Sequence, residues 1–362
     1  MRPGPVGEEA LVDCRPRSLS ATPAGEIRAN ENTCIAPHAG ADGFFWADPR
    51  PLGPVKLVLL VFGGILTAAI VVTGIWAWTP DRSRSELEKR YWDPSMRYIE
   101  VGGTSIRVRE SGDSHAPAII LLHGFGSSLE TWEPWARSLS TRYRVVRFDF
   151  PGSGLSEPDR SGNYTDARNL ELIEQLMDKI GLENATLIGN SMGGRIAWRF
   201  AAAFPNRVHK LVLISPDGFA SPGFEYGKRP HVPAALNLMK YFLPRILIRN
   251  YLATAYGDPS RLSDSVIDRY YDLLLAPGNR AALLSRMRQN ILEEPSAILR
   301  QIGTPTLLLW GKKDRVIPFS NSADYVRALP HVRLVEFPDL GHVPHEEAPG
   351  ESMKPVEQFL GE

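Results

Sequence analysis

The segment 186–204 constrains the fold of this chain most, because an apolar run there enters a glycine-rich turn and leaves it as a helix-like stretch. Residues 187–194 read LIGNSMGG, so Ser191 stands between Gly189 and Gly193 in a Gly-x-Ser-x-Gly pattern. On a sharp strand-to-helix turn the serine has strained backbone angles, and side chains at the two glycines would collide with the neighbouring strand and helix. The turn holds the hydroxyl clear of the sheet. A bare pattern of this kind also arises by chance, and a glycine-rich turn without chemistry is the alternative.

Two further polar residues follow predicted strands downstream. A buried-strand pattern at 306–310 precedes Asp314, and a second strand-like run at 332–337 precedes His342. Both residues therefore lie just past the carboxyl end of a strand, where open α/β sheets place their sites. A serine nucleophile needs a base and a group that orients the base. The pattern predicts that Ser191, Asp314 and His342 form a catalytic triad.

A fourth element precedes the serine. The predicted strand 118–122 ends in HGFG, which has the position and composition of an oxyanion-binding loop. We expect the backbone amides of Phe125 and Met192 to form the oxyanion hole. We expect His123 and Gly124 to support that loop, with no proton transfer by His123.

These segments resemble the serine α/β-hydrolases of the lipase, esterase and carbon–carbon hydrolase group, from about Arg97 to the C-terminus. The segments that carry the resemblance are HGFG at 123–126, DFPGSGLS at 149–156, GNSMGG at 189–194, WGKKD at 310–314 and Gly-His at 341–342. The order Ser, Asp, His is the order of this family. Related haloalkane dehalogenases and epoxide hydrolases place Asp at the nucleophile, so Ser191 argues against both. Asn190 resembles the meta-cleavage-product hydrolases, although His, Asn and Thr all occur there across the family.

The predicted catalytic acid and the predicted base each have an alternative candidate in the sequence. Asp217 lies in a Ser-Pro-Asp-Gly turn after a predicted strand, and some α/β-hydrolases use an acid at that position. The Trp-Gly-x-x-Asp pattern favours Asp314 over it. His345 follows His342 by three residues and could compete for the role of base. The Gly-His pair directly after the strand favours His342.

The rest of the domain alternates between predicted strands and helices, which indicates an α/β fold with a mostly parallel sheet and helices on both faces. The resemblance implies the α/β-hydrolase fold with eight strands, over residues 97–362. The strand pattern breaks at about 216–302, where prolines and aromatic residues interrupt helical stretches. This insertion matches the cap domain of the family.

A long apolar run precedes the domain. Residues 57–78 contain twenty-two residues without a charge, enough for a helix to cross the roughly 30 Å hydrocarbon core of a membrane. Trp76 and Trp78 suit the interfacial belt. The run exceeds the roughly 7 to 15 apolar residues of a cleavable signal peptide, and uniformly apolar core helices of this length are rare. We predict a single transmembrane signal anchor at 55–80, followed by a linker at 81–96.

The N-terminal tail and the orientation are less constrained. Residues 1–54 are rich in Pro, Gly, Ala and charges without periodicity, so we predict a disordered tail. A second hypothesis is that this tail is not translated natively and that Val55 initiates the chain; the intact mass of the native protein decides between them. Four basic residues after the apolar run, against two before it, favour a cytoplasmic catalytic domain. An anchor starting near Val55 would often insert the other way, so the side stays open.

The composition argues against several classes of binding partner. Lys plus Arg and Asp plus Glu both number 41, and no long basic stripe indicates a nucleic acid. Cys14 and Cys34 lie in the tail, and no Cys/His spacing indicates zinc, so we expect neither a metal nor a cofactor. No obligate protein partner is evident from the sequence.

The predicted cap is apolar at helical spacing, and we expect most of its large residues to pack internally while a minority line a hydrophobic acyl or aryl pocket. The residues concerned are Leu236, Leu238, Met239, Tyr241, Phe242, Leu243, Ile246, Leu247, Tyr251, Leu252 and Tyr256. Together with the anchor, this cap favours a membrane-bound serine esterase or lipase that cleaves a small lipophilic carboxylic ester such as a monoacylglycerol or lysolipid. The chain is similar in this respect to membrane-anchored monoacylglycerol-lipase-like hydrolases. The alternatives are a carbon–carbon bond hydrolase of the meta-cleavage-product type and a non-catalytic ligand-binding protein on the same fold.

Overall fold

The computed structural model of the protein describes residues 53–221 and 225–362. The predicted tail lies almost entirely outside the described residues. Its disorder and its native translation therefore stay predictions.

Helix α1 (Pro54–Ala77) coincides with the apolar run. Its segment Pro54–Ile75 has 22 residues with a mean hydropathy of 2.6, and none of it is buried. At 1.5 Å per residue this segment is about 33 Å long. Proline suits the first position of a helix, and Pro80 cannot continue one, so both boundaries follow from the sequence. The described chain thus has one helix long and apolar enough to span a membrane.

Eight strands form one sheet in the order β1-β2-β4-β3-β5-β6-β7-β8. The strands are β1 (Met96–Val101), β2 (Thr104–Ser111), β3 (Ala118–Leu122), β4 (Arg144–Phe148), β5 (Ala185–Asn190), β6 (Val208–Ile214), β7 (Thr306–Gly311) and β8 (Val332–Phe337). The pairs β1–β2 and β2–β4 are antiparallel and every other pair is parallel. The predicted α/β-hydrolase fold with a mostly parallel eight-stranded sheet is confirmed.

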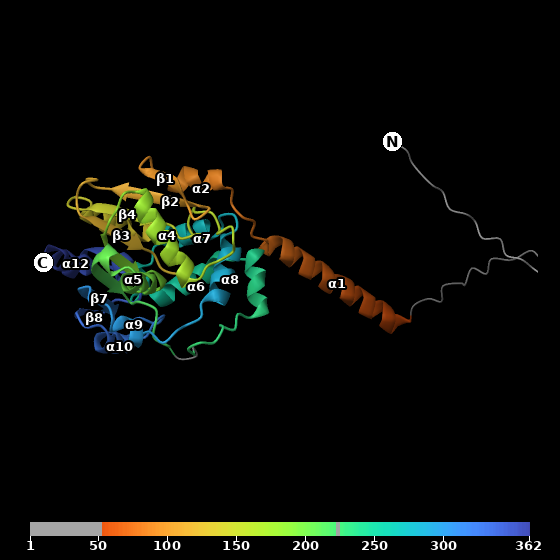
Figure 1. Cartoon of the computed structure of the whole chain (residues 1–362). Helices are drawn as coiled ribbons and strands as arrows, with labels where there is room; N and C mark the ends of the chain where they lie inside the picture. The colour runs from red at the N-terminus through yellow and green to blue at the C-terminus, as the bar shows by residue number, and fades with distance from the viewer. Residues whose placement is uncertain (1–52, 222–224) are drawn as a thin grey trace, which may run out of the picture. The chain divides into compact units, whose positions relative to one another are not determined.

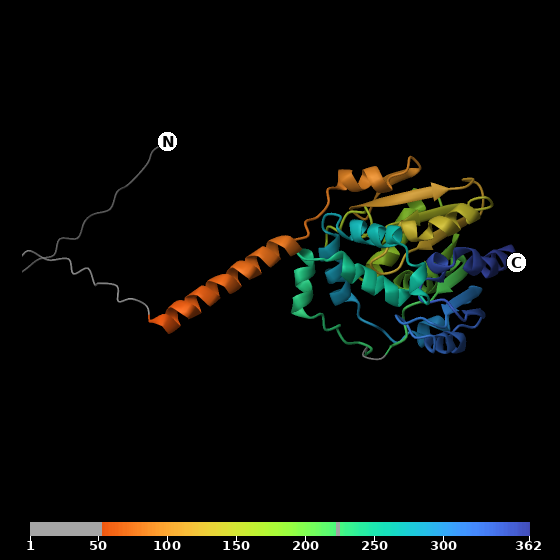
Figure 2. The same ribbon diagram turned by 180° about the vertical axis from the view of Figure 1, so that it is seen from behind.

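Helices cover both faces of the sheet (Figure 1 and Figure 2). These helices are α3 (Glu133–Leu139), α4 (Asp166–Lys179), α5 (Met192–Ala203), α10 (Asn321–Ala328) and α12 (Pro349–Gly361). Alternate residues of β3 separate the two layers, because successive side chains of a strand point to opposite faces. Ile120 and Leu122 belong to the cluster with α4, α5 and α10, whereas Ile119 and Leu121 belong to the cluster with α3 and α12.

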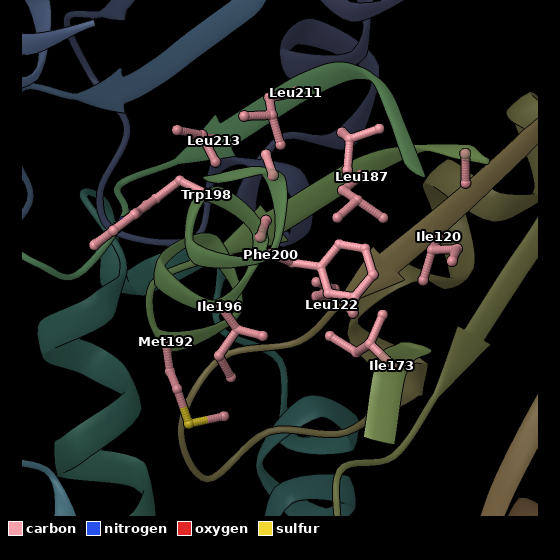
Figure 3. Close-up of a cluster of buried hydrophobic side chains, with 14 of the residues drawn as sticks. Ile120, Leu122, Ile173, Leu187, Met192, Ile196, Trp198, Phe200, Leu211 and Leu213 are labelled. Carbon is pink, nitrogen blue, oxygen red and sulfur yellow. The ribbon is translucent and has the colours of Figure 1, made fainter. Parts of the chain in front are cut away.

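Figure 3 shows the first of these clusters, where Ile196 and Phe200 of α5 lie beside Leu122, Leu187 and Ile173. The labelled side chains are all nearly or fully buried. Burial of one such aliphatic or aromatic side chain contributes about 1.5–3 kcal/mol. The packed helix fixes the position of its own N-terminus, which directly follows Ser191.

The segment predicted to be a cap lies between β6 and β7. It contains α6 (Arg245–Ala255), α7 (Asp264–Leu274), α8 (Asn279–Gln289), α9 (Ser296–Leu299) and the 3₁₀ helices η3 (Ala234–Lys240) and η4 (Pro259–Arg261). The cap has its own small core, and Leu243, Leu252 and Tyr256 are buried as expected. The expectation of internal packing is wrong for Leu238, Tyr241, Ile246 and Leu247, because at least 49% of the surface of each is exposed. Tyr251 is 47% exposed and lines a cavity, as expected for a minority of these residues.

A short helix, α2 (Arg84–Tyr91), lies inside the predicted linker. Leu87 is fully buried against Leu155, Leu273 and Ala276, and the Tyr91 hydroxyl donates a hydrogen bond of 2.8 Å to Asp272. This part of the segment 81–96 is therefore packed against the domain and is not a free connection.

Candidate active site

The strand-turn-helix around Ser191 has the strained geometry that its glycines indicate. Ser191 has φ 54° and ψ −119°, an uncommon conformation for a residue with a side chain. A Cβ at Gly189 would collide with the backbone of Gly193, and a Cβ at Gly193 would collide with the carbonyl oxygen of Leu122. The close approach of β3, β5 and α5 therefore requires both glycines. The turn places Ser191 at the carboxyl end of β5, directly before α5.

The structure brings Asp314 and His342 together. Asp314 Oδ2 lies 2.8 Å from His342 Nδ1, and Asp314 Oδ1 accepts hydrogen bonds from the amides of Val316 (2.8 Å) and Ile317 (2.9 Å). The Asp314 side chain is fully buried, and 7% of the His342 side chain is exposed. A carboxylate held in this way fixes Nδ1–H of the imidazole, which leaves Nε2 free to accept a proton.

Ser191 and His342 are connected through Asn190. The Asn190 amide nitrogen donates to the backbone oxygens of His342 (3.0 Å) and Ile214 (3.2 Å), so the residue before Ser191 positions the histidine loop. No hydrogen bond joins the Ser191 hydroxyl to the His342 ring among the described side chains. Catalytic hydrogen bonds often tighten only when a substrate is bound.

The expected oxyanion residues lie beside the serine. Phe125, Ser191 and Met192 line one cavity of about 330 Å³. Met192 is the first residue of α5, so its amide has no acceptor within the helix. Gly124 also approaches closely, because a Cβ there would lie 3.0 Å from Asn190 Oδ1. This arrangement can bind a negatively charged oxygen next to Ser191.

His123 is fully buried under the oxyanion loop. Its Nε2 accepts a hydrogen bond from the Phe150 amide (3.1 Å), and its Nδ1 lies 2.8 Å from the Gly124 carbonyl oxygen. These partners require a neutral ring with the proton on Nδ1. Burial lowers the pKa of His123 to about 4, which agrees with that tautomer at neutral pH. The contacts fit the expected support of the loop.

The two rival residues have other partners. The Asp217 carboxylate forms an ion pair with Arg195, while Asp314 holds His342. His345 stacks on Trp132 with ring centroids 4.2 Å apart, and burial lowers its pKa to about 3. These contacts favour the Asp314–His342 pair as the acid and base.

Glu347 is a positioning residue that sequence reasoning missed. Its carboxylate accepts hydrogen bonds from the amides of Gly341 (2.8 Å), Gly257 (3.0 Å) and Asp258 (2.8 Å). It thereby joins the loop of His342 to the cap. The one available signal is an acidic side chain five residues after the predicted base, and such residues are usually solvent-exposed. The positioning contacts of Asn190 were missed as well.

The wall of the cavity is mostly apolar and also contains charged side chains. The apolar side chains include Phe125, Phe219, Val232, Tyr251, Leu292 and Ile317. The charged residues are Arg195, Asp217 and Arg286. Within residues 53–221 and 225–362, no three His, Cys, Asp or Glu side chains are grouped so that they could hold a metal ion.

The pattern of the family described as alpha/beta hydrolase fold matches residues 117–349, well over half of the chain. The protein therefore belongs to the α/β-hydrolase fold family, as the resemblance implied. Among curated relatives, a 2-hydroxy-6-oxononadienedioate/2-hydroxy-6-oxononatrienedioate hydrolase of Comamonas testosteroni is 28% identical over 266 residues, or 71% of this chain and 92% of the relative. A 2-hydroxy-6-oxo-6-phenylhexa-2,4-dienoate hydrolase of Burkholderia cepacia is 28% identical with the same coverage.

Two solved structures extend the comparison. A bacterial membrane phospholipase A is 26% identical with a TM-score of 0.61, and the match covers 85% of this chain and 96% of that one. A meta-cleavage product hydrolase from Pseudomonas fluorescens is 25% identical with a TM-score of 0.63. This match covers 73% of this chain and 97% of that one. These similar proteins are hydrolases.

Proposed function

We propose that this protein is a serine hydrolase that breaks a carbon–carbon bond next to a ketone in a dienoate of the meta-cleavage-product type. The observation that carries the proposal is the cavity that Ser191 and Met192 line, with the Asp314–His342 pair held 2.8 Å apart on the neighbouring loops. The curated dienoate hydrolases support the substrate class, because they match over 92% of their own length. From the sequence alone, cleavage of a lipophilic ester was the first candidate and carbon–carbon bond cleavage the second. These comparisons favour carbon–carbon bond cleavage as the first candidate.

The proposed chemistry needs only the residues of this site. Ser191 Oγ attacks the ketone carbon while His342 takes its proton, and Asp314 stabilises the imidazolium. The amides of Phe125 and Met192 bind the oxyanion; the loss of one such donor typically costs about 10²–10³ in turnover. The carbon–carbon bond then breaks, and its electron pair leaves with the dienoate fragment, which is protonated by His342. Water deprotonated by His342 hydrolyses the remaining acyl-serine.

Cleavage of a lipid ester is the second candidate. The membrane phospholipase A structure matches 85% of this chain, more than the 73% that the P. fluorescens hydrolase covers. Helix α1 is long and apolar enough to span a membrane. We propose a single-pass membrane location on these grounds, with the side of the catalytic domain left open. The same triad would form an acyl-enzyme from a carboxylic ester.

One substrate panel separates the two candidates. The full chain in detergent is assayed with 2-hydroxy-6-oxo-6-phenylhexa-2,4-dienoate and with 4-nitrophenyl esters of increasing acyl length. We expect the highest kcat/KM for the dienoate, and a maximum for a long-chain ester would favour the lipid substrate instead. A fluorophosphonate probe should label the wild type and leave Ser191→Ala unlabelled. Absence of both labelling and turnover would favour a non-catalytic binding protein.

A further inference from the structure

A buried cation in the wall of the active-site cavity has no carboxylate partner among the residues that the structure describes. Arg286, in the last turn of α8, is 5% exposed. Its guanidinium donates a hydrogen bond of 2.8 Å to the Pro151 carbonyl oxygen and lies 3.9 Å from Met192 Sδ. The rings of Tyr164 and Phe150 lie 5.2 and 6.0 Å from its central carbon. All of these neighbours are uncharged.

Other buried arginines of the domain are compensated. Arg195 forms ion pairs with Asp166 and Asp217, and Arg107 forms one with Asp149. A buried charge without an opposite charge is costly, so proteins usually pair it in this way. Aromatic faces, one carbonyl oxygen and the negative end of a helix compensate a cation only in part.

The charge of this arginine persists at neutral pH. Burial lowers the pKa of Arg286 to about 10, which still leaves the guanidinium protonated at pH 7. Arg195 and Arg286 face the cavity with Asp217 as the one carboxylate in its described wall. The lining therefore carries two positive charges against one negative charge, and the negative charge is already engaged with Arg195.

A ligand bound in this cavity would lie beside both the Arg286 guanidinium and Ser191, the proposed nucleophile. Arg286, Ser191 and Met192 all line it, and Met192 also contacts Arg286 through its sulfur atom. A planar guanidinium matches the oxygens of a carboxylate or a phosphate, and its hydrogen bonds to an anion are stronger than those to a neutral acceptor. The cavity thus offers a charged recognition point in an otherwise mostly apolar wall.

We infer that Arg286 is the anion-binding residue of the substrate cavity and that the substrate carries an oxyanion of a carbon or phosphorus acid at that position. The inference rests on the proposed function in one respect, namely that the cavity beside Ser191 holds the substrate. The carboxylate of a dienoate and the phosphate of a phospholipid headgroup are the two sources of such an anion.

Binding to the Ser191→Ala variant tests this inference without turnover. Calorimetry on the full chain in detergent compares two matched pairs of probes. The first pair is 2-hydroxy-6-oxo-6-phenylhexa-2,4-dienoate and its carboxamide, and the second is monohexanoyl lysophosphatidate and monohexanoylglycerol. We expect the charged member of one pair to bind about 10- to 100-fold more tightly than its neutral partner. The pair that shows the larger difference identifies the source of the anion.

Substitutions in the same background assign the preference to Arg286. Arg286→Met should abolish the difference between charged and neutral probes, and Arg286→Lys should restore part of it. Arg288→Met is the matched control, because Arg288 lies two residues further on α8, is exposed, and donates to Asn237. This control should keep the full preference.

Equal binding of both members of each pair to Ser191→Ala would overturn the inference, and this result needs no Arg286 variant to fold. A preference that survives in folded Arg286→Met would overturn it too; the thermal unfolding midpoint reports the fold. Wild-type protein that turns over no substrate would contradict the proposed function alone, since binding is measured on a variant that lacks the nucleophile.

Discussion

The sheet side and the cap side of the candidate active site are built in different ways. On the sheet side, polar groups hold one another in place: the Asp314 carboxylate accepts two amides and contacts His342, and Asn190 donates to two backbone oxygens. On the cap side, apolar side chains dominate, and Arg286 lacks a described carboxylate partner. Under the proposed function, the sheet side would supply the reaction and the cap side would select the substrate. Substitutions on the two sides should therefore affect different quantities.

The largest expected effect comes from a substitution on the sheet side. Asp314→Asn should reduce kcat about 10⁴-fold, because the amide favours the wrong tautomer of His342. Asp217→Asn should have a far smaller effect on kcat, since Asp217 pairs with Arg195. Steady-state kinetics on both variants measures the contrast. Near-normal turnover of Asp314→Asn with loss in Asp217→Asn would reverse the assignment of the acid.

The second contrast uses one residue type in both regions. Leu213, fully buried in β6, should lose about 2–5 kcal/mol of unfolding free energy on substitution by alanine. Leu247 in the cap is 52% exposed, so Leu247→Ala should change the unfolding free energy by about 0.5 kcal/mol or less. Denaturant unfolding in detergent measures both values. An equally large loss at Leu247 would mean that this cap surface is covered in the folded protein.

The two regions also differ in what sequence patterns reveal. Strands such as β5 and β7 are buried on both faces, so they appear as short apolar runs bounded by turns. The predicted triad and oxyanion residues lie after the carboxyl ends of β3, β5, β7 and β8, and motifs mark them directly. The fold and the candidate site are thus encoded locally in this part of the chain.

Other features depend on contacts that no local pattern contains. Helix α2 buries a single large residue, Leu87, which gives no periodicity to detect. The roles of Asn190 and Glu347 follow from amides and carbonyls on other elements. The exposed apolar residues of α6 look the same in sequence as packing residues. Whether a side chain such as Leu247 is buried depends on the tertiary arrangement of the cap.

A third prediction concerns the link between nucleophile and base. Asn190→Ala leaves the backbone oxygens of His342 and Ile214 without their described side-chain donor, so the unfolding free energy should fall by about 1–3 kcal/mol. Because the histidine loop loses an anchor, kcat should fall more than KM rises. Asn190→Asp is a useful comparison, since it keeps the size but places a carboxylate against two carbonyl oxygens. Unchanged kcat in folded Asn190→Ala would remove this residue from the positioning of His342.

The smallest expected effect appears only on acidification. Burial lowers the pKa of His345 to about 3 in the folded protein, against about 6.5 in the unfolded chain. Between these values the unfolded state binds the extra proton, so the unfolding free energy should fall as pH decreases below about 6.5. By pH 5.5 the fall that this one group causes is about 1 to 1.5 kcal/mol.

His345→Gln should remove that contribution, so its unfolding free energy should fall less steeply between pH 6.5 and 4.5 than that of the wild type. His123, whose pKa burial lowers to about 4, remains in both proteins and cancels in the comparison. Denaturant unfolding at several pH values measures the slopes. Identical slopes would show that His345 is protonated in the folded protein. The stack on Trp132 would then hold an imidazolium, and His345 would again compete with His342 as a proton carrier.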